Sequence, residues 1–401
     1  MHSMKRRKIV NKYERNSSES IHKYVINTEQ CNIQRRRIKV GIIGAGFIGP
    51  VHIEALRRLG FVEVTAIASG KNTPKKAKQL NILKVYNNYK QLLEDKDIEV
   101  IHNCTPNFLH FQINKDILES GKHIISEKPL TTNSVDSGKL VELAKKTRLL
   151  NAVNYNYRFY PLVQQIKEMV CNGEIGDIYS IHGSYLQDWL LYETDFNWRV
   201  DSNLGGKTRA ISDIGSHWCD LVQYITGLKI VKVFGDLNIV HNTRKRANQN
   251  IKISTEDYAS VLLNFNNDAK GVFTVSQVSP GRKNRLYFEI DGSKKSVCWD
   301  QEEPEQLWVG YRDKANEILL RDSNLLSNKV KKYVNYPGGH PEGYLDALYN
   351  FMKSFYGDVI KNNFKKNPDY ATFVDGHNEV LLCEKILESY KKQKWIEVKC
   401  S

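Results

Sequence analysis

The chain has 401 residues and a formal net charge of +14, with 41% hydrophobic and 26% charged residues. This length favours two globular domains with cores of their own, and the lack of about 18 consecutive apolar residues excludes an ordinary membrane-spanning helix. Seven scattered cysteines without Cys-x-x-Cys spacing favour reduced thiols in the cytoplasm over a disulfide framework or a zinc site. We therefore expect a cytoplasmic protein with no bound metal.

The first 37 residues carry half of the excess positive charge. They contain ten Lys or Arg and three Glu, a net of +7, which leaves +7 for the other 364 residues. The segment lacks the apolar core of a secretory signal, and its glutamates argue against a transit peptide. We expect residues 1–37 to be a disordered basic leader or an over-long start. A basic arm that binds nucleic acid or lipid stays open, but no matching basic stripe follows, so we predict neither partner.

Residues 38–155 alternate between strand and helix patterns. An apolar run at 38–43 is followed by the turn Gly44-Ala45-Gly46-Phe47-Ile48-Gly49 and then by a helical stretch. Further strands are predicted at 62–68, 100–104 and 123–125, with helices over 73–80 and 107–120. This order is typical of a doubly wound parallel sheet, so we predict an α/β Rossmann domain.

Residues 156–401 have a different pattern, with extended segments that often alternate in polarity. Strands are predicted at 179–189, 231–240, 258–265, 271–278, 285–290 and 296–299, and helices over 160–172, 212–226, 340–360 and 373–391. We expect an α+β domain with one open-faced, mainly antiparallel sheet that serves substrate binding and oligomerisation. Such a sheet, with helices on one face, tends to bury its other face against a partner, which predicts a homodimer or a homotetramer.

The glycine turn lies between a strand and a helix, the context in which this motif holds a dinucleotide. Gly44 permits the tight turn, Gly46 lets the backbone approach a pyrophosphate, and Gly49 lets helix and strand pack closely. The helix start at Phe47 and Ile48 offers free N–H groups to the phosphates. A glycine-rich turn without a ligand is the alternative.

Three further stretches turn this into a family-level pattern. They are Cys104-Thr105-Pro106-Asn107-Phe108-Leu109-His110, Glu127-Lys128-Pro129 and Asp213-Ile214-Gly215-Ser216-His217. In this order they resemble the glucose–fructose oxidoreductase, inositol dehydrogenase and rhizopine catabolism (Gfo/Idh/MocA) family over about residues 38–400. The resemblance implies a Rossmann domain followed by an open-faced sheet domain, a nicotinamide cofactor, and catalytic positions at Lys128, Asp213 and His217. The cofactor contacts that we assign to the first two stretches are Thr105, Pro106, Asn107, His110, Glu127 and Lys128.

The catalytic candidates also have a chemical rationale of their own. Lys128 follows a strand end at the edge where α/β proteins bind ligands, and it can donate a hydrogen bond to a substrate oxygen. On the predicted helix, Asp213, His217, Asp220 and Tyr224 are spaced by 4, 3 and 4 residues, so they share a face that we expect to border a cleft. A neutral His217 can take a hydroxyl proton while Asp213 orients it. A solvated lysine and a packed histidine are the alternatives.

The substrate candidates begin the second domain. They are Tyr157, Arg158, Gln187, Asp188, Trp198 and Arg199, together with Asp213 and His217. Aromatic platforms mixed with amide, carboxylate and guanidinium groups suit a polyhydroxylated ring. Core packing of the aromatic residues and surface pairing of Arg199 remain equal alternatives.

The choice of nicotinamide cofactor depends on the end of the second strand. An enzyme that uses NAD usually places Asp or Glu there to bind the ribose 2′-hydroxyl, but residues 66–72 contain neither. Instead Ser69 can donate to a 2′-phosphate and Lys71 supplies positive charge, with Lys75 and Lys76 close behind. We therefore predict that NADP is preferred, with loose use of both NADP and NAD as the alternative.

Together these features predict an NAD(P)-dependent oxidoreductase that interconverts a secondary alcohol and a ketone on a sugar, a sugar derivative or a polyol. A catalytically silent NAD(P)-binding sensor or regulator is the alternative, because a fold alone does not guarantee activity.

Overall fold

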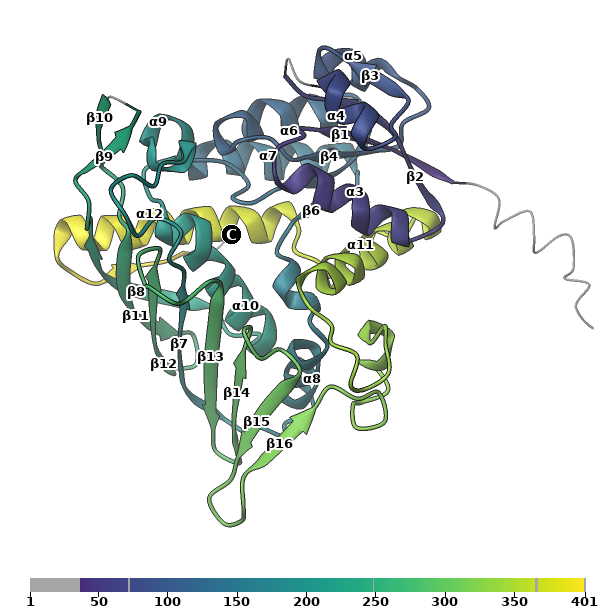
Figure 1. The fold of residues 1–401 in the computed structure, drawn as a ribbon. Coiled ribbons are helices and arrows are strands. Elements are labelled where there is room, and N and C mark those ends of the chain that lie inside the picture. Colours follow the sequence, from purple (N-terminus) through teal and green to yellow (C-terminus); the bar gives the residue numbers. More distant parts are fainter. Residues whose placement is uncertain (1–36, 71–72, 248, 365–366, 400–401) are drawn as a thin grey trace, which may run out of the picture.

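The computed structural model describes residues 37–70, 73–247, 249–364 and 367–399. The predicted leader, apart from Arg37, lies outside the described residues, and so does Lys71. Two large sheets, each flanked by helices, form most of the described part of the chain (Figure 1).

The first sheet is parallel and has six strands. They are β1 (Ile38–Ile43), β2 (Val62–Ala68), β3 (Lys84–Tyr86), β4 (Val100–Asn103), β5 (His123–Ser126) and β6 (Asn151–Val153). Their order, β3-β2-β1-β4-β5-β6, is that of a doubly wound Rossmann sheet, so the predicted α/β fold class is confirmed. Successive strands are added on one side of β1 up to β3 and on its other side from β4 to β6, so the switch point of the sheet lies between β1 and β4. Ligands of such sheets bind beyond the carboxyl ends of the two strands at the switch point.

The helices of this unit cover both faces of the parallel sheet. They are α3 (Ile48–Arg58), α4 (Thr73–Gln79), α5 (Tyr89–Glu94), η1 (Asn107–Leu109), α6 (His110–Glu119) and α7 (Ser134–Thr147). Helix α3 starts within the glycine turn, and Pro50 lies in its first turn, where a missing N–H costs no hydrogen bond. Ile53, Ala55 and Leu56 are buried on one side of α3, and the short turn after β1 places the helix N-terminus next to the carboxyl end of that strand.

The second sheet has nine strands. They are β7 (Ile178–Leu186), β8 (Ile230–Asn238), β11 (Tyr258–Phe265), β12 (Lys270–Ser276), β13 (Arg285–Gly292), β14 (Ser296–Asp300), β15 (Gln306–Gly310), β16 (Glu317–Leu320) and β17 (Ile396–Glu397). The order is β16-β15-β14-β13-β7-β12-β11-β8-β17, and every neighbouring pair is antiparallel except β7 and β12. The prediction of a mainly antiparallel sheet is confirmed. The parallel pair arises because β7, the first strand in sequence, inserts between β12 and β13.

A separate ribbon of β9 (Thr243–Arg246) and β10 (Gln249–Lys252) was not predicted. The remaining helices are η2 (Asn156–Phe159), α8 (Pro161–Cys171), η3 (Trp198–Val200), α9 (Ser202–Gly205), η4 (Ile211–Gly215), α10 (Ser216–Thr226), η5 (Lys331–Tyr333), α11 (Tyr344–Lys361) and α12 (Phe373–Lys392). The single helix predicted over 212–226 is in fact a π-helical turn, η4, followed by the α-helix α10.

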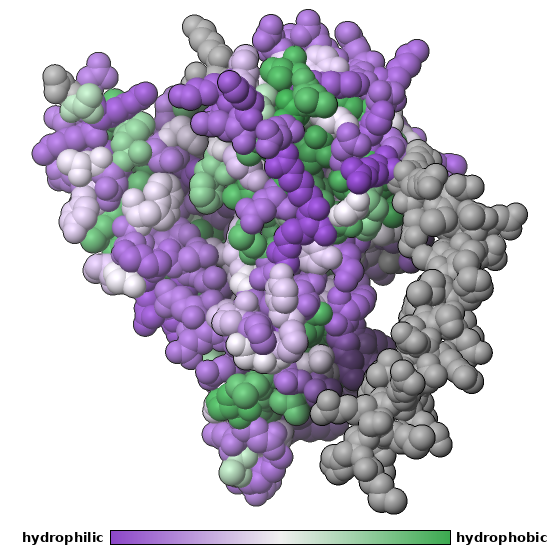
Figure 2. All heavy atoms as spheres, turned by 45° about the vertical axis from the view of Figure 1, so that its right-hand side comes forward, coloured by the Kyte–Doolittle hydropathy of each residue, from purple (hydrophilic) through white to green (hydrophobic). Residues whose placement is uncertain are grey.

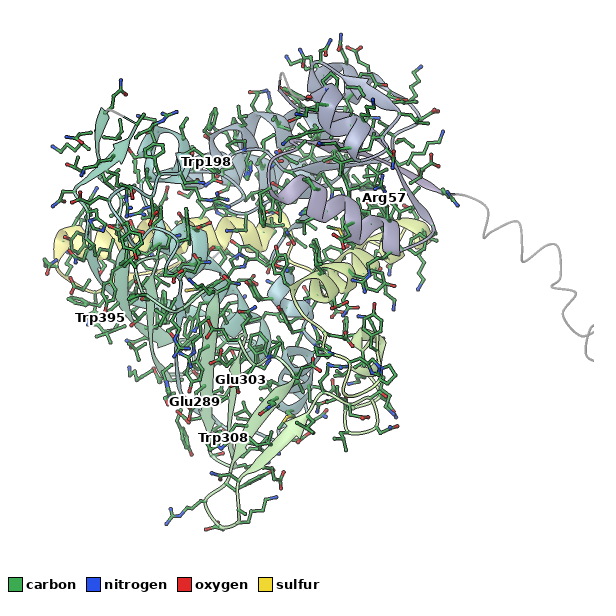
Figure 3. All side chains as sticks on the ribbon, in the orientation of Figure 1. Arg57, Trp198, Glu289, Glu303, Trp308 and Trp395 are labelled. Carbon is green, nitrogen blue, oxygen red and sulfur yellow. The ribbon has the colours of Figure 1, made fainter. Side chains whose placement is uncertain are left out.

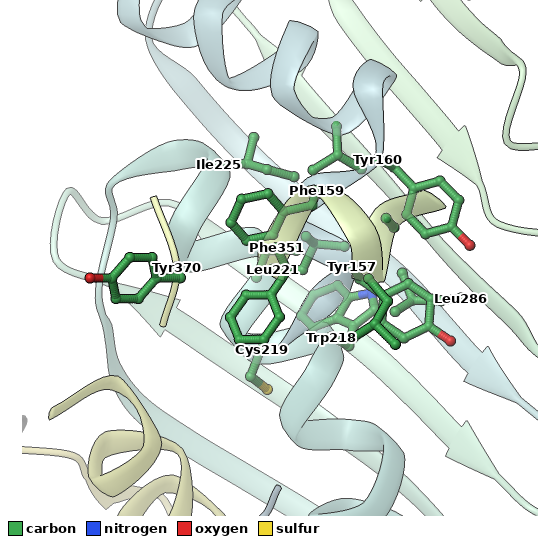
Figure 4. Close-up of a cluster of buried hydrophobic side chains, with 14 of the residues drawn as sticks. Tyr157, Phe159, Tyr160, Trp218, Cys219, Leu221, Ile225, Leu286, Phe351 and Tyr370 are labelled. Carbon is green, nitrogen blue, oxygen red and sulfur yellow. The ribbon is translucent and has the colours of Figure 1, made fainter. Parts of the chain in front are cut away.

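One face of the nine-stranded sheet carries the core of the second unit. Trp218 of α10 is fully buried; its ring stacks on Phe273 at 4.7 Å, and its Nε1 donates to the carbonyl of Tyr287 at 2.9 Å. Figure 4 shows Trp218 beside Leu221 on α10, within the buried cluster. On the other face, no helix of the described part of the chain is packed, and Leu262 and Val272 are exposed there.

The C-terminal helices join the two units. Helix α11 packs against α3, and α12 packs against α7, β6 and β8. The backbone N–H of Val153, at the end of β6, donates to the carbonyl of Ala371 at 2.8 Å. The two sheets are therefore held in one arrangement by segments far apart in the sequence. Within the described ranges, no helix is both long and apolar enough to span a membrane.

Candidate active site

A cavity of about 1060 Å³ lies between the carboxyl ends of the parallel strands and one end of the second sheet. Most of the predicted site residues line it: Gly44, Gly46, Phe47, Ile48, Ser69, Thr105, Pro106, Asn107, Glu127, Lys128, Tyr157, Gln187, Trp198, Arg199, Asp213 and His217. Figure 3 shows Trp198 near the part of the second unit that faces the parallel sheet. We call the part of the cavity that is formed by the first unit the cofactor half. The part that is formed by the second unit is the substrate half.

The glycine turn shapes the cofactor half. Gly44 has a φ of +96°, and a Cβ there would lie 2.5 Å from the carbonyl oxygen of Cys104, so only glycine fits. A Cβ on Gly46 would meet no atom within 4 Å, which leaves open space over this backbone for a ligand. The N–H of Ala45 donates to Ser69 Oγ at 3.1 Å and so holds the turn against the end of β2. An open backbone cradle at a helix start fits the pyrophosphate of a dinucleotide.

Two predicted cofactor residues act behind the cavity surface. A Cβ on Gly49 would lie 2.3 Å from the carbonyl oxygen of Gly44, so Gly49 permits helix packing, as expected, but does not line the cavity. His110 is fully buried, with Nδ1 2.7 Å from the carbonyl of Pro129 and Nε2 2.8 Å from that of Thr105. This corrects the expectation that His110 contacts the cofactor: it ties together two loops that line the cavity.

Lys128 and Asp213 meet where the two halves join. Lys128 Nζ donates to Asp213 Oδ1 at 2.8 Å and to the Asp213 carbonyl at 2.7 Å. Gln277 Nε2 donates to Asp213 Oδ2 at 2.9 Å, and Arg199 Nε lies 3.4 Å from Oδ1. Burial alone would raise the pKa of Asp213, but the charges of Lys128 and Arg199 hold it well below its usual range. Asp213 is therefore a carboxylate that positions Lys128.

His217 stands one turn further along, held by aromatic rings. The edges of Tyr155 and Tyr157 contact the His217 ring at centroid distances of 5.3 and 5.0 Å. Its Nδ1 is buried and has no hydrogen-bond partner among the described residues. Burial, and then the charge of Lys128, lowers the pKa of His217 to about 3, so the ring is neutral at physiological pH. Asp213 makes no hydrogen bond to His217 and so does not orient the ring directly, but its charge favours the protonated form, as expected.

The predicted polar row on this helix is only partly in the cavity. Asp213 and His217 line it, whereas Asp220 pairs with Arg158 and Tyr224 contacts Gln164. The four residues extend over three turns, roughly 16 Å of helix, and only the N-terminal turns reach the cavity.

Two predicted substrate contacts are corrected by their ion pairs. Arg158 is buried, its Nε donates to Asp220 Oδ2 at 2.8 Å, and Nη2 lies 3.4 Å from Asp375 Oδ1. Asp188 accepts from Lys283 Nζ at 2.6 Å and from the Gly281 N–H at 3.2 Å. Neither side chain lines the cavity, because each is already paired with a neighbouring charge outside it.

Comparison with known proteins identifies the family. Residues 38–155 match the family model of the Gfo/Idh/MocA oxidoreductases with an NAD-binding Rossmann fold, and residues 163–298 match the model of the Gfo/Idh/MocA C-terminal domain. The chain belongs to the Gfo/Idh/MocA family. The resemblance seen in its motifs is thereby confirmed, and with it an oxidoreductase that uses a nicotinamide cofactor.

Relatives in this family cover nearly the whole chain. Levoglucosan dehydrogenase of Pseudarthrobacter phenanthrenivorans is 27% identical over an alignment of 394 positions that covers 90% of this chain and 98% of that protein. Myo-inositol 2-dehydrogenase of Thermotoga maritima is 25% identical over an alignment of 367 positions that covers 90% of this chain and 99% of that protein. A solved levoglucosan dehydrogenase in complex with NADH and L-sorbose has a TM-score of 0.85 at 25% identity and covers 91% of this chain and 100% of its own.

The sequence motifs of this family member did not reveal several cavity residues. Tyr185, Trp189, Asn197, Asn284 and Tyr344 line the substrate half, and Gln277 holds Asp213 from behind. They lie on separate segments between β7 and α11, and none stands in a spacing that a motif would mark. Two of them do have a local signal: Trp189 directly follows the predicted Gln187 and Asp188, and Asn197 directly precedes the predicted Trp198 and Arg199.

A buried ion pair supports the cofactor half. Glu127 Oε1 lies 2.9 Å from His52 Nε2, and Asn154 Nδ2 donates to the same oxygen at 2.6 Å. Burial alone would raise the pKa of Glu127, but His52 and Asn154 lower it to about 2. Burial would likewise lower the pKa of His52, yet Cys104 and Glu127 raise it to about 10. The pair holds a carboxylate at the cavity wall, directly before Lys128.

A cluster of buried charges supports the substrate half. Asp257 binds both Arg209 and Arg244, and Arg244 Nη1 donates to the carbonyl of Tyr192 at 2.8 Å, in the loop that leads to Trp198. Glu256 Oε1 accepts from the N–H groups of Arg209 and Ile211 at 2.8 and 2.9 Å, which anchors the turn that carries Asp213. Among the described residues, no group of three or more His, Cys, Asp or Glu could hold a metal ion.

Proposed function

We propose that the protein interconverts a secondary alcohol and a ketone on an uncharged sugar, sugar derivative or polyol, with hydride passing to or from NADP in preference to NAD. The observation that carries this proposal is the meeting of Lys128, Asp213 and His217 in a cavity whose opposite wall is an open glycine cradle. The same geometry supports Lys128, Asp213 and His217 as the catalytic residues.

A bound nicotinamide supplies the hydride acceptor or donor, and the chain supplies the proton chemistry. Neutral His217 removes the hydroxyl proton during oxidation and returns it during reduction. Lys128, held by the Asp213 carboxylate, donates a hydrogen bond to the reacting oxygen and stabilises the charge that develops there. The turn residues Gly44, Gly46, Phe47 and Ile48, and the loop residues Thr105, Pro106 and Asn107, are the proposed cofactor contacts, with Glu127 beneath them.

The substrate half supports an uncharged polyhydroxylated ring. Trp189, Trp198 and Tyr344 offer aromatic surface, while Gln187, Asn197 and Asn284 offer amide groups. Arg199 is already engaged, since it lies 3.4 Å from Asp213 and 4.6 Å over the Trp198 ring. The names of the relatives, which include dehydrogenases of levoglucosan and of myo-inositol, agree with this substrate class.

The decisive experiment is a screen of sugars, glycosides, anhydrosugars and inositols with both cofactors, read at the reduced-nicotinamide absorbance band. Lys128→Met and His217→Ala are expected to lower kcat by about 100-fold or more, because each removes a group that handles the proton. Cofactor affinity, measured by fluorescence titration, is expected to stay within about threefold of the native value. Near-native turnover in either folded variant would refute the assignment. A native protein that binds cofactor but oxidises no member of the panel would favour the sensor instead.

The proposed NADP preference rests on the end of β2. Ser69 lines the cavity, and no carboxylate stands among residues 66–70 to repel a 2′-phosphate. Lys76 Nζ donates to the Ala45 carbonyl, which places a positive charge beside the same turn. The test compares kcat/KM for NADP and NAD in the native protein and in Lys71→Ala. A native preference for NAD would refute the proposal, and an unchanged ratio in the variant would remove only the role of Lys71.

We also propose the division into units at 38–155 and 156–401, a cytoplasmic location, and a homodimer or homotetramer formed through the uncovered sheet face. The described cysteines are all unpaired, which agrees with a reducing compartment. Figure 2 shows hydrophobic residues just above the lower tip of the molecule, the end at which Figure 1 places β15 and β16; Ile318 and Leu320 of β16 are exposed. A monomer by light scattering at micromolar concentration would contradict the oligomer.

A further inference from the structure

A closed network of hydrogen bonds forms part of the substrate half. Its members are Tyr157, Tyr185, Gln187, Trp189 and Asn284, and all five line the cavity. Trp189 Nε1 lies 2.8 Å from Gln187 Oε1, and Gln187 Nε2 lies 2.7 Å from Asn284 Oδ1. Asn284 Oδ1 also lies 2.8 Å from Tyr185 Oη, while Asn284 Nδ2 lies 2.8 Å from Tyr157 Oη. The two tyrosine oxygens are 2.7 Å apart and close the ring.

The direction of every bond in this network follows from one group. An indole N–H can only donate, so Gln187 must turn its carbonyl oxygen toward Trp189 and its amide nitrogen toward Asn284. Asn284 must then receive that bond on Oδ1, which turns its own amide nitrogen toward Tyr157. Tyr185 donates to Asn284 Oδ1, and Tyr157 donates to Tyr185, which gives each of the five contacts one hydrogen.

Without the indole N–H, the other four hydrogen bonds could all run in the opposite direction, with every donor and acceptor exchanged, and would be satisfied equally well. Gln187 and Asn284 would each turn over, and Asn284 would donate one hydrogen to Gln187 and one to Tyr185. Tyr157 would donate to Asn284, and Tyr185 would donate to Tyr157. A buried polar group needs a hydrogen-bond partner, but an amide or a hydroxyl can act as donor or as acceptor. The network therefore has two satisfied states, the observed one and the reversed one. Trp189 selects one of them.

The two states differ in what Asn284 offers to a bound molecule. In the observed state its oxygen already accepts two hydrogen bonds, from Tyr185 and from Gln187, so its remaining free group is an N–H. In the reversed state both N–H groups are used, and only an oxygen lone pair remains. The Asn284 side chain is half-buried in the cavity wall, so this group is within reach of a ligand.

We propose that Trp189 is a specificity-determining residue: through Gln187 it fixes the Asn284 amide so that the wall donates a hydrogen bond to an acceptor oxygen of the sugar. Such an oxygen is a ring or bridging ether, or a hydroxyl whose own hydrogen points elsewhere. Trp189 acts as a positioning residue through two amides. This inference rests on the proposed function, because it assigns a sugar to the same cavity.

The test uses the sugar that the screen identifies as the best substrate, together with its monodeoxyfluoro analogues. Fluorine cannot donate a hydrogen bond, so an N–H at the wall tolerates it and a lone pair does not. For the position that faces Asn284, native protein is expected to accept fluorine with at most a threefold rise in KM. Trp189→Phe removes the indole N–H and leaves the two states about equally populated, so it is expected to raise the KM ratio of fluoro to hydroxy sugar only about twofold.

Two further variants separate direction from bulk. Gln187→Glu presents only acceptors, so it forces Asn284 into the reversed state even with Trp189 in place, and it is expected to raise the ratio further, about tenfold. Trp198→Phe removes another indole N–H from the same cavity but outside the network, and it is expected to leave the ratio unchanged. Equal ratios in native protein, Trp189→Phe and Gln187→Glu would overturn the inference, and so would an equal shift in Trp198→Phe.

A measurement without turnover distinguishes this inference from the proposed function. Neutron diffraction on the native protein and on Trp189→Phe locates the amide hydrogens of Asn284 directly. We expect one of them toward Tyr157 in the native protein, and in the variant a mixture of this orientation with the reversed one, in which they point toward Tyr185 and Gln187. A single, unchanged amide orientation in the variant overturns the inference even if sugars are oxidised. Two orientations in a protein that oxidises none of the panel uphold the selection by Trp189 and refute the proposed function.

Discussion

The two halves of the cavity are built in different ways. The cofactor half consists largely of backbone at the ends of parallel strands, and Gly44, Gly46 and Gly49 stand within six consecutive residues. The substrate half consists of side chains from η2, β7, η3, α10 and the start of β13, which only the fold brings together. Substitutions in the cofactor half therefore act mainly by filling the room next to the backbone. Substitutions in the substrate half act by removing hydrogen bonds or by changing the charges packed behind the cavity.

The largest effect is expected behind the substrate half, where Arg158 is buried against Asp220. Arg158→Met leaves the Asp220 carboxylate without its partner, which is expected to lower the free energy of unfolding by about 3–5 kcal/mol in a urea titration. Arg199→Met is the matched control, because the Arg199 side chain is partly exposed, and it is expected to cost less than about 1 kcal/mol. If the Arg158→Met protein were as stable as the native protein and had a raised KM for the sugar, Arg158 would be a substrate contact after all.

The glycines of the cofactor half allow fold and binding to be separated. Gly46→Ala adds a methyl group in open space, so the melting temperature is expected to stay within about 2 °C while cofactor Kd rises about 100-fold, roughly 2.7 kcal/mol. Gly49→Ala places its Cβ 2.3 Å from the carbonyl oxygen of Gly44, so the melting temperature itself is expected to fall. Calorimetry and fluorescence titration measure the two quantities. The same loss of stability in both variants would contradict an open cradle at Gly46.

A smaller effect is expected from the pH dependence of Glu256. Burial raises the pKa of Glu256 to about 7, against an unfolded value near 4.5, so the unfolded state binds fewer protons between these values. The contribution of Glu256 to stability is therefore complete below about pH 4.5 and is lost as pH rises through 7, by about 3 kcal/mol. Glu256→Gln keeps an oxygen for the N–H groups of Arg209 and Ile211 but removes the titration. Its stability is expected to vary less between pH 5 and 8 than that of the native protein, and parallel curves would contradict this.

The smallest effect is expected at Gln277, which supports Asp213 from outside the cavity. Gln277→Leu removes one hydrogen bond to the carboxylate and leaves the bonds from Lys128, so kcat is expected to fall about tenfold while KM for the sugar changes little. Gln277→Glu places a second carboxylate beside Asp213 and is expected to lower kcat further and to shift its pH profile. Unchanged kcat in both variants would show that Lys128 alone positions Asp213.

The polar row on the predicted helix over 212–226 shows how much helical spacing alone can predict about a site. The spacing of Asp213 and His217 correctly indicated that both face one cavity. The same spacing extended the row to Asp220 and Tyr224, which lie deeper and are taken up by Arg158 and Gln164. Helical periodicity states which side chains share a face, but it carries no information about where the opposing surface ends. The break into η4 and α10 likewise depends on contacts outside the helix, because Glu256 binds the N–H groups of Arg209 and Ile211.

The sequence by itself determined the elements whose causes are local. The apolar run of β1, the glycines that a tight turn and a close helix require, and the alternation of β1, β2, β4 and β5 with α3, α4 and α6 follow from side-chain size and periodicity over a few residues. The short elements β3, α5 and β6, and helix α7, were not predicted. Only the tertiary structure decided the substrate half: which groups hold Asp213, which charges neutralise Arg158, and which way the amide of Asn284 points. Each of these is a pairing between segments distant in the chain. Its outcome depends on which polar groups burial leaves without water, and that is decided only when the segments pack.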